Sequence, residues 1–405
     1  MTIEELYKIY LDNPNITTDS RNCPKHSIFF GIKGEHFDGT LYGDKAIENG
    51  ATLAITENSL ETLQKLANYH IRQLKAKGLK VIGITGTNGK TTTKELVSTV
   101  LQKKYNVLYT LGNFNNHLGV PLTLLRLRPE HDIAVIEMGA NHPGEIKDLV
   151  NIVEPQYGLI TSVGRAHLEG FGGFEGVIKT KGELYDFLRE HGGKVFLNTS
   201  NEHLVPIAKD IETIPYIEGK VEECNPYVKF SFSGSHEDVT CQTNLIGDYN
   251  IVNLLAAATV GRYFGVSDED ISAALASYSP TNNRSQLMKT SKNTLIVDAY
   301  NANPTSMAAA LDNFKAINAT QEKMVILGGM GELGPTSAEE HQKIREKIEA
   351  VGVKTVWLVG ELWGDCTFKN VYEVIAHLEK EPLADKLILI KGSNSQKLFK
   401  LPEYL

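Results

Sequence analysis

The residues best suited to carry chemistry lie in one stretch, Val81–Lys94, which reads VIGITGTNGKTTTK. A short apolar run leads into the glycine turn Gly86–Gly89, and Lys90 and three threonines follow. A glycine-rich loop that opens a helix directs several backbone N–H groups at one point, at the positive end of the helix dipole. Such a point suits a phosphate group, to which Lys90 adds a charge, and the Thr91 hydroxyl can ligate magnesium.

The spacing departs from the strict GxxxxGK[ST] pattern, because Ile84 stands where the first glycine belongs. The alternative is an ordinary glycine turn between a strand and a helix. Because Gly-Lys-Thr follows directly at 89–91, we favour a nucleotide site.

Two further polar residues follow predicted strands. Glu137 lies near the carboxyl end of the predicted strand 132–138, and His167 follows the predicted strand 157–163. Strands that alternate with helices predict a parallel sheet, whose ligands collect beyond the carboxyl ends of the strands. A nucleotide-bound magnesium needs oxygen ligands, which Glu137 could supply. Taken alone, Glu137 could equally be a charged residue that faces solvent at the end of a strand. His167 alone is more typical of a loop histidine that makes hydrogen bonds than of a metal ligand.

Other polar groups have structural as well as functional interpretations. Lys181 lies on a predicted helix and by itself is typical of a solvated lysine. The asparagines of GNFNNHLG (112–119) are typical of turns, and their density also suits recognition of a peptide or sugar. Asn250 and Asn253 open a predicted helix, where they could cap it or read a base edge. The GxGxxG match at Gly329–Gly334 lacks an acidic residue at the expected interval, so we predict no dinucleotide site there.

Length and composition bound the class of protein. A chain of 405 residues suggests two or three domains, and a net charge of −8 argues against a general nucleic-acid binder. The start, MTIEELYKIY, lacks the apolar core of a signal peptide, and the longest apolar segment, Leu254–Gly261, is too short to cross a bilayer. The four cysteines show no CxxC spacing, so we expect reduced thiols in a cytoplasm and no cysteine zinc site.

The elements that must position these residues divide into three segments. Residues 1–77 predict a small α/β unit with strands at 27–32 and 51–56 and helices ending at Gly50 and spanning 60–75. Residues 78–282 predict a parallel-sheet domain around the phosphate loop. The alternating stretch Val228–Leu245 predicts antiparallel strands added to the main sheet of this domain. Residues 283–405 predict a second α/β domain.

In that last segment the predicted strands are 294–297, 324–327, 355–359 and 387–390, and the predicted helices are 305–314 and 337–351. Ser337 and Glu340 have the spacing of a capping box at the start of the second helix.

Together these motifs resemble the Mur ligases, the ATP-dependent amide-forming enzymes of peptidoglycan synthesis. TGTNGKTTTKE (85–95) is similar to the stretch that the whole family shares. GNFNNHLGVPLTLL (112–125), EMGANHPGEI (137–146) and DAYNANPTSM (298–307) resemble the branch that adds D-alanyl-D-alanine. The DNPR-type motif of another branch is absent from the sequence.

The resemblance implies an α/β fold of three domains that bind UDP, ATP and, in a Rossmann-like last domain, the amino substrate. It also implies a reaction. The terminal carboxylate of UDP-N-acetylmuramoyl-tripeptide, whose third residue is diaminopimelate or lysine, attacks the γ-phosphate of ATP and gives an acyl phosphate and ADP. The amine of D-Ala-D-Ala then displaces phosphate. The implied cofactors are ATP and two Mg²⁺ ions.

The same resemblance assigns roles to individual residues. The implied catalytic residues are Lys90, His167 and Lys181. The implied metal ligands are Thr91, Glu137, His167 and Lys181, the last as a carbamate. The implied ATP-binding residues are Gly86, Thr87, Asn88, Gly89, Lys90, Thr91, Thr92, Asn253, Arg284 and Asp298. The implied substrate-binding residues are Ser20, Arg21, Asn115, Asn116, Asn301 and Asn303.

Two positions depart from the family pattern. Gly329 stands where many relatives have Asp, and Asn394 replaces the arginine of the KGSR motif. Both concern the contacts of the last domain with D-Ala-D-Ala and not the ATP site. Two alternatives remain open: a Mur-type or folylpolyglutamate-type ligase with another amino acceptor, and a non-catalytic nucleotide-binding paralogue. We expect a cytoplasmic monomer whose partners are small-molecule substrates, with no nucleic acid and no membrane.

Overall fold

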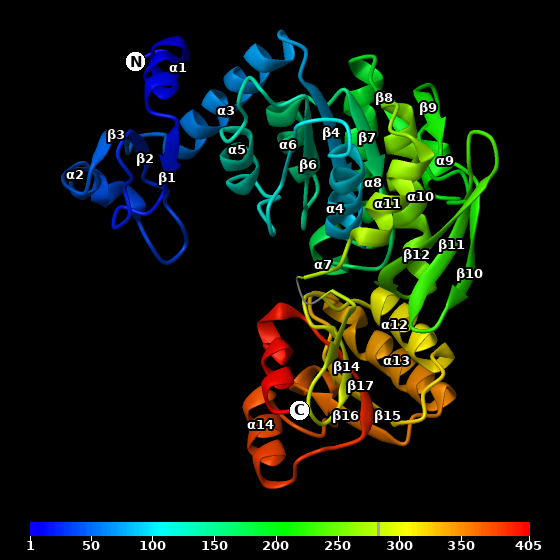
Figure 1. Ribbon diagram of the computed structural model, residues 1–405. Coiled ribbons are helices and arrows are strands. Elements are labelled where there is room, and N and C mark those ends of the chain that lie inside the picture. The colour runs from blue at the N-terminus through cyan, green and yellow to red at the C-terminus, as the bar shows by residue number, and fades with distance from the viewer. Residues whose placement is uncertain (282–283) are drawn as a thin grey trace.

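The computed structural model describes residues 1–281 and 284–405, which build four β-sheets with helices around them. Figure 1 shows the first sheet at one side, the largest sheet in the centre, and the last sheet below the centre. A small antiparallel sheet lies beside the central one. This arrangement agrees with the predicted α/β class.

The first sheet is parallel and has the order β1-β2-β3. Its strands are β1 (Asn15–Thr17), β2 (Ser27–Phe30) and β3 (Ala51–Ile55), and its helices are α1 (Ile3–Asp12), η1 (Gly39–Tyr42), α2 (Gly43–Glu48) and α3 (Ser59–Lys75). The two predicted strands are confirmed in slightly shorter form. Helix α1 was not predicted, although Thr2 and Glu5 form a capping box at its start.

The central sheet is parallel throughout and has the order β5-β6-β4-β7-β8-β9. Its strands are β4 (Lys80–Thr85), β5 (Val107–Tyr109), β6 (Ile133–Glu137), β7 (Tyr157–Ile160), β8 (Lys194–Leu197) and β9 (Glu212–Pro215). Because β4 lies between β6 and β7, the residues that follow these three strands meet at one edge of the sheet.

The helices of this region pack on both faces of the central sheet. They are α4 (Lys90–Leu101), α5 (Gly119–Leu124), α6 (Glu145–Val153), α7 (Leu168–Phe171), α8 (Phe174–Glu190), α9 (Leu204–Ile207), η2 (Asp248–Asn250), α10 (Ile251–Tyr263) and α11 (Asp268–Ser277). On one face, the apolar sides of α4 and α10 meet, with Val97, Val100 and Leu254 in one buried cluster.

The antiparallel strands were predicted to extend the main sheet, and that part of the prediction is wrong. They form a separate sheet of β10 (Gly219–Cys224), β11 (Tyr227–Ser233) and β12 (Asp238–Ile246). Alternation gives β11 one apolar face, and Phe230 and Phe232 on that face are buried in the same cluster as Leu254 of α10. The apolar face is therefore covered by helices, and no edge pairing with the central sheet is needed to bury it.

The last sheet has the order β13-β14-β17-β15-β16, in which only β13 is antiparallel to its neighbour. Its strands are β13 (Gln286–Lys289), β14 (Thr294–Asp298), β15 (Glu322–Gly328), β16 (Thr355–Val359) and β17 (Lys386–Lys391). The helices are α12 (Pro304–Ala316), η3 (Gly334–Thr336), α13 (Ser337–Val351), η4 (Glu361–Trp363), α14 (Val371–Lys380), η5 (Asn394–Gln396) and η6 (Leu398–Glu403).

Helix α13 has the predicted bounds, but the predicted capping box is wrong. The cap residue is Thr336, whose backbone is helical and whose side chain makes no cap hydrogen bond to the described residues. The preceding turn η3 runs directly into α13, so Ser337 already lies inside the helix and cannot cap it. Within the described part of the chain, no helix is long and apolar enough to cross a membrane.

Candidate functional site

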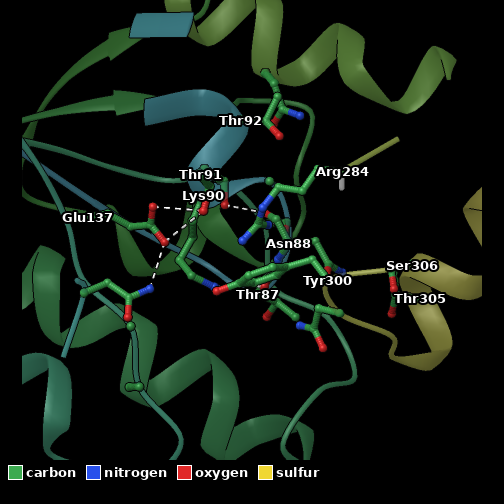
Figure 2. A pocket seen from close by; sticks show the side chains of 18 of the residues that line it. Thr87, Asn88, Lys90, Thr91, Thr92, Glu137, Arg284, Tyr300, Thr305 and Ser306 are labelled. Carbon is green, nitrogen blue, oxygen red and sulfur yellow. Dashed lines mark hydrogen bonds between the residues drawn. The ribbon is translucent and has the colours of Figure 1, made fainter. Parts of the chain in front are cut away.

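A cavity of about 760 Å³ lies where the carboxyl edge of the central sheet faces the last sheet. Both regions contribute to its walls, as Figure 2 shows for the labelled residues of the phosphate loop and for Arg284, Tyr300 and Thr305 opposite them. The predicted site residues among its described walls are Thr87, Asn88, Gly89, Lys90, Thr91, Thr92, Asn115, Asn116, Glu137, His167, Asn253, Arg284, Asp298 and Asn301.

The phosphate loop joins β4 to α4 and depends on its two glycines. Gly86 and Gly89 have φ values of +143° and +81°, a backbone region that favours glycine. A Cβ on Gly89 would lie 2.6 Å from Oδ1 of Asn253. Gly89 is also the cap residue of α4 and has no side chain to bond the first-turn N–H groups. Those groups have no partner within the helix, so they can receive the oxygens of a phosphate.

Lys90 lies over this loop. Its Nζ donates hydrogen bonds to the carbonyl oxygens of Gly86 at 2.7 Å and Thr87 at 3.0 Å. Removal of water from the ammonium lowers the pKa of Lys90 to about 8, against the opposing effect of Glu137. Lys90 therefore keeps its charge near neutral pH and is held where a phosphate would arrive.

Glu137 and Thr91 form the most suitable pair for a hard cation. The Thr91 hydroxyl lies 3.0 and 3.2 Å from the two carboxylate oxygens of Glu137, and Nδ2 of Asn115 donates to Oε1 at 2.9 Å. Figure 2 shows the bonds between Thr91 and Glu137 as dashed lines. The buried Nζ of Lys94 lies 4.0 Å from Oε2. Carboxylate and hydroxyl oxygens at the phosphate loop fit the preferences of Mg²⁺.

Among the described residues, no three His, Cys, Asp or Glu side chains gather into a complete metal-binding cluster. A magnesium ion at Glu137 would therefore take its remaining ligands from nucleotide oxygens and water, as is usual for Mg²⁺ at phosphate sites.

His167 and Lys181 occupy different places. His167 lines the cavity, precedes α7 with φ +52°, and its Nδ1 contacts the carboxylate of Glu332 from the last region. Burial lowers the pKa of His167. Lys181 lies on α8 behind the cavity wall, where its Nζ donates to the carbonyl of Ala140 at 3.2 Å.

Lys181 is buried, and its Nζ lies 4.9 Å from the centroid of the Phe171 ring. Loss of water around the ammonium, followed by repulsion from Lys90, lowers the pKa of Lys181 to about 7. A large fraction of this amine is therefore neutral at physiological pH, and carbamylation requires the neutral amine.

The wall opposite the phosphate loop contains an unused hydrogen-bond donor. The Arg284 guanidinium stacks on the ring of Tyr300 at 3.9 Å, and its buried Nε has no partner among the described residues. Asp298 accepts a bond of 2.6 Å from Nζ of Lys391. A nucleotide in this cavity would meet a free guanidinium donor and an oriented carboxylate.

Asn250 and Asn253 do not cap α10 with their side chains. Nδ2 of Asn253 donates to Oδ1 of Asn250 at 2.8 Å, and its Oδ1 accepts from the Thr93 hydroxyl at 2.9 Å. These bonds hold the Asn253 amide in a fixed orientation at the cavity wall, next to Gly89.

The predicted substrate residues are only partly brought together. Oδ1 of Asn116 accepts from the N–H of Gly119 at 2.8 Å and so holds the start of α5. Asn303 is not among the described residues of the cavity wall, and its amide exchanges two hydrogen bonds with the amide of Asn88 at 2.8 and 3.4 Å. Ser20 and Arg21 lie on the first region, where Arg21 pairs with Asp19 at 2.9 Å.

Several cavity residues were not predicted, among them Tyr249, Tyr300, Thr305 and Lys391. Tyr300 and Thr305 lie inside the stretch DAYNANPTSM, and Lys391 ends the strand β17. A systematic search of the residues that follow each predicted strand would have found the last of these.

Comparison with known proteins agrees with this arrangement. Three family descriptions match: "Mur ligase family, catalytic domain" at residues 14–90, "Mur ligase middle domain" at 84–261, and "Mur ligase, glutamate ligase domain" at 283–394.

Relatives match over nearly the whole chain. A UDP-N-acetylmuramoyl-tripeptide–D-alanyl-D-alanine ligase of Bacillus subtilis is 34% identical over 391 residues, which cover 89% of this chain and 84% of that protein. The ligase of the same name from Escherichia coli is 32% identical and covers 94% and 91%.

Solved structures show the same fold. A crystal structure of MurF from Acinetobacter baumannii matches with a TM-score of 0.89 at 28% identity and covers 99% of this chain and 98% of that one. MurF of Thermotoga maritima in complex with ADP matches with a TM-score of 0.84 at 24% identity and covers 97% of each chain.

Proposed function

The chain belongs to the Mur ligase family, and from this membership we propose that it joins D-Ala-D-Ala to UDP-N-acetylmuramoyl-tripeptide at the expense of ATP. The reaction forms an amide bond during the synthesis of peptidoglycan precursors. The observation that carries the proposal is one cavity that unites the phosphate loop and Glu137 with Arg284 and Asp298 of the last region. Such a site can activate a carboxylate and then admit an amine from the opposite wall.

In the first half-reaction, the chain positions two anions against each other. Lys90 and the first-turn N–H groups of α4 hold the β- and γ-phosphates, and Arg284 offers its free Nε to the nucleotide. Magnesium, when bound beside Glu137 and Thr91, supplies positive charge to the phosphate oxygens. The substrate carboxylate then attacks the γ-phosphorus, and ADP leaves. Catalysis here consists of positioning and charge stabilisation.

His167 and a carbamylated Lys181 are proposed to hold the second magnesium ion. The low pKa of Lys181 supports this role, since the neutral amine can take up carbon dioxide and become an anion. The proposed nucleotide contacts beyond the phosphates are those of Asn253 and Asp298, which their neighbours orient. Asn115, Asn116 and Asn301 are proposed to line the peptide path.

We retain the predicted division into three domains as part of the proposal. Residues 1–77 would bind the UDP moiety through Ser20 and Arg21, residues 78–282 would bind ATP, and residues 283–405 would bind the dipeptide. The protein would act as a cytoplasmic monomer on small-molecule substrates.

Phosphate release by the purified chain tests this function. With ATP and Mg²⁺, release is expected only when UDP-N-acetylmuramoyl-tripeptide and D-Ala-D-Ala are both present, because the acyl phosphate needs an amine to turn over. Omission of either substrate is the control. Release that does not depend on the dipeptide would contradict the proposal.

A panel of amine acceptors separates the alternatives. Preference for a single amino acid over D-Ala-D-Ala would indicate another ligase on this scaffold. ATP binding without product for any acceptor would indicate a nucleotide-binding protein without turnover.

A further inference from the structure

Glu332 lies at the contact between the central and last regions. It lies in the loop Gly329–Gly334 after β15, and its carboxylate contacts Nδ1 of His167 across the boundary between the central and last regions. Both residues have left-handed backbone conformations, with φ +60° for Glu332 and +52° for His167. Non-glycine residues in this conformation are uncommon and concentrate at functional sites.

The loop that carries Glu332 is anchored on both sides. Nε2 of the buried His341 accepts from the N–H of Met330 at 2.9 Å, while its Nδ1 donates to the carbonyl of Ser337 at 2.7 Å. The carbonyl of Glu332 itself accepts from the N–H of Glu169 at 3.4 Å. The Glu332 backbone is thus fixed by partners from α13 and α7, while its side chain remains 60% exposed. A carboxylate held in this way is accessible to a ligand.

The other carboxylates near the cavity are mostly engaged. Glu137 accepts from Thr91 and Asn115, and Asp298 pairs with Lys391. Glu145 accepts from the backbone N–H groups that precede α6. Asp148 on α6 lines the cavity without such bonds to described side chains, and Glu332 of the last region, which is not a lining residue, contacts only the imidazole of His167 among the described side chains.

The proposed reaction requires a negatively charged group near the point where the dipeptide amine attacks. The proposed reaction brings a dipeptide with a positively charged amino terminus to a cavity whose phosphate end carries Lys90 and Arg284. These cations repel an ammonium group, so a carboxylate must hold it close to the activated carbonyl. Glu332 is not among the residues that line the cavity, but it comes from the last region, and its carboxylate reaches the cavity wall through its contact with the lining residue His167.

We propose that Glu332 binds the α-ammonium group of the incoming dipeptide beside the acyl phosphate. After the ammonium group releases one proton to water, the neutral nitrogen attacks the carbonyl carbon and displaces phosphate. This role rests on the proposed function and adds a named substrate-binding residue to it. His341 is then a positioning residue, since it fixes the loop that carries Glu332.

The substitution Glu332→Gln tests the role, because it keeps the shape of the side chain and removes its charge. The KM for D-Ala-D-Ala is expected to rise about 10- to 100-fold, as for the loss of one charge-assisted hydrogen bond. The KM values for ATP and for the UDP-tripeptide should stay within about 2-fold of the wild type. Glu332→Asp, which keeps the charge and tolerates the left-handed backbone, should give an intermediate KM.

Hydroxylamine separates amine binding from carboxylate activation. It is a small, neutral nucleophile that traps an acyl phosphate as a hydroxamate and needs no ammonium-binding carboxylate. Glu332→Gln should therefore form hydroxamate at the wild-type rate when the dipeptide is left out. The matched control is Glu169→Gln, which removes the charge of an exposed carboxylate whose side chain lies against Gly334 of the same loop.

Three outcomes would overturn the inference. Equal loss of hydroxamate and dipeptide product would place Glu332 in the activation half-reaction, through His167. An unchanged KM for the dipeptide in Glu332→Gln would show that Glu332 does not bind the amine. An equal rise of this KM in Asp148→Asn would assign amine binding to Asp148 on α6. Failure of the proposed function itself is distinguishable, because the wild-type protein would then form no hydroxamate or no amide product with D-Ala-D-Ala.

Discussion

Three lysines at or near the cavity have different surroundings. Lys90 has its pKa lowered to about 8 and donates to two loop carbonyls. Lys181 is buried with one carbonyl partner, and its pKa falls to about 7. Lys391 is equally buried but pairs with Asp298 at 2.6 Å. The residue type therefore does not decide the role, since the neighbours decide whether the lysine acts as a cation, a neutral amine or a structural ion pair.

The substitution Lys90→Met removes the cation over the phosphate loop and keeps most of its volume. We expect kcat for ATP-dependent phosphate release to fall about 100- to 1000-fold, the usual cost of losing one preorganised electrostatic contact. Lys103→Met, in the exposed turn that follows α4, is the control and should leave kcat unchanged. Activity of Lys90→Met within a few-fold of the wild type would show that the loop does not hold the reacting phosphates.

At the scale of elements, a buried polar cluster fixes the first region to the central one. Tyr10 of α1 donates to the carbonyl of Leu125 at 2.6 Å, and Arg128 donates to the Tyr10 hydroxyl at 2.9 Å. His70 of α3 lies 3.1 Å from the carbonyl of Leu127 and 3.2 Å from the Tyr7 hydroxyl. Helices α1 and α3 are thus joined to the segment after α5 by hydrogen bonds inside an apolar surrounding.

The burial of His70 at this contact predicts that the stability of the protein depends on pH. Burial lowers the pKa of His70 to about 4 from its usual 6.5. Between these two values the unfolded chain binds more protons, so the free energy of unfolding decreases as the pH falls from 6.5 to 4. This residue contributes at most about 1.4 kcal/mol per pH unit.

Urea denaturation at pH 7 and pH 5 measures the effect. In His70→Gln the loss of stability between these pH values should be smaller than in the wild type, whereas the exposed His36→Gln should retain the full loss. An identical loss in all three proteins would assign the pH dependence to other groups.

At the scale of the whole molecule, side chains far apart in the sequence join the phosphate loop to the last sheet. Asn88 and Asn303, which are 215 residues apart, exchange two hydrogen bonds. Arg165 after β7 donates to the buried Glu340 of α13 at 3.0 Å. Because Asn88 lies in the phosphate loop, the position of the last region and the shape of the nucleotide site depend on each other.

Two substitutions of one residue separate this contact from helix capping. Asn303 also caps α12, where its Oδ1 accepts from the N–H of Ser306 at 2.9 Å. Asn303→Ser keeps a capping hydroxyl and loses the amide pair, while Asn303→Ala loses both.

Both variants are expected to raise the KM for ATP by a similar factor, on the order of 5-fold, from the loss of about 1 kcal/mol of hydrogen bonding. Only Asn303→Ala should also lower thermal stability, by about 1 kcal/mol. Thermal unfolding and steady-state kinetics of the two proteins check this. A normal KM for ATP in Asn303→Ser would show that the amide pair does not shape the nucleotide site.

The sequence alone determined the features that depend on neighbours along the chain. The strand, glycine turn and helix at Val81–Lys94 follow from a buried run, two glycines and helical spacing, and all three are present. The three α/β segments and their order were equally predictable, since alternating strands and helices must form parallel sheets. The fold and the family could therefore be recognised from local patterns and motifs.

Only the tertiary structure decided which side chains from different segments meet. Strand periodicity predicted β11 and β12 but not that helices would cover their apolar face and leave them as a separate sheet. It likewise gave no sign that Asn303 would bond to Asn88, or that Glu332 would contact His167. Such pairs depend on how whole regions dock, and docking is the sum of many weak contacts between residues that are distant in the sequence.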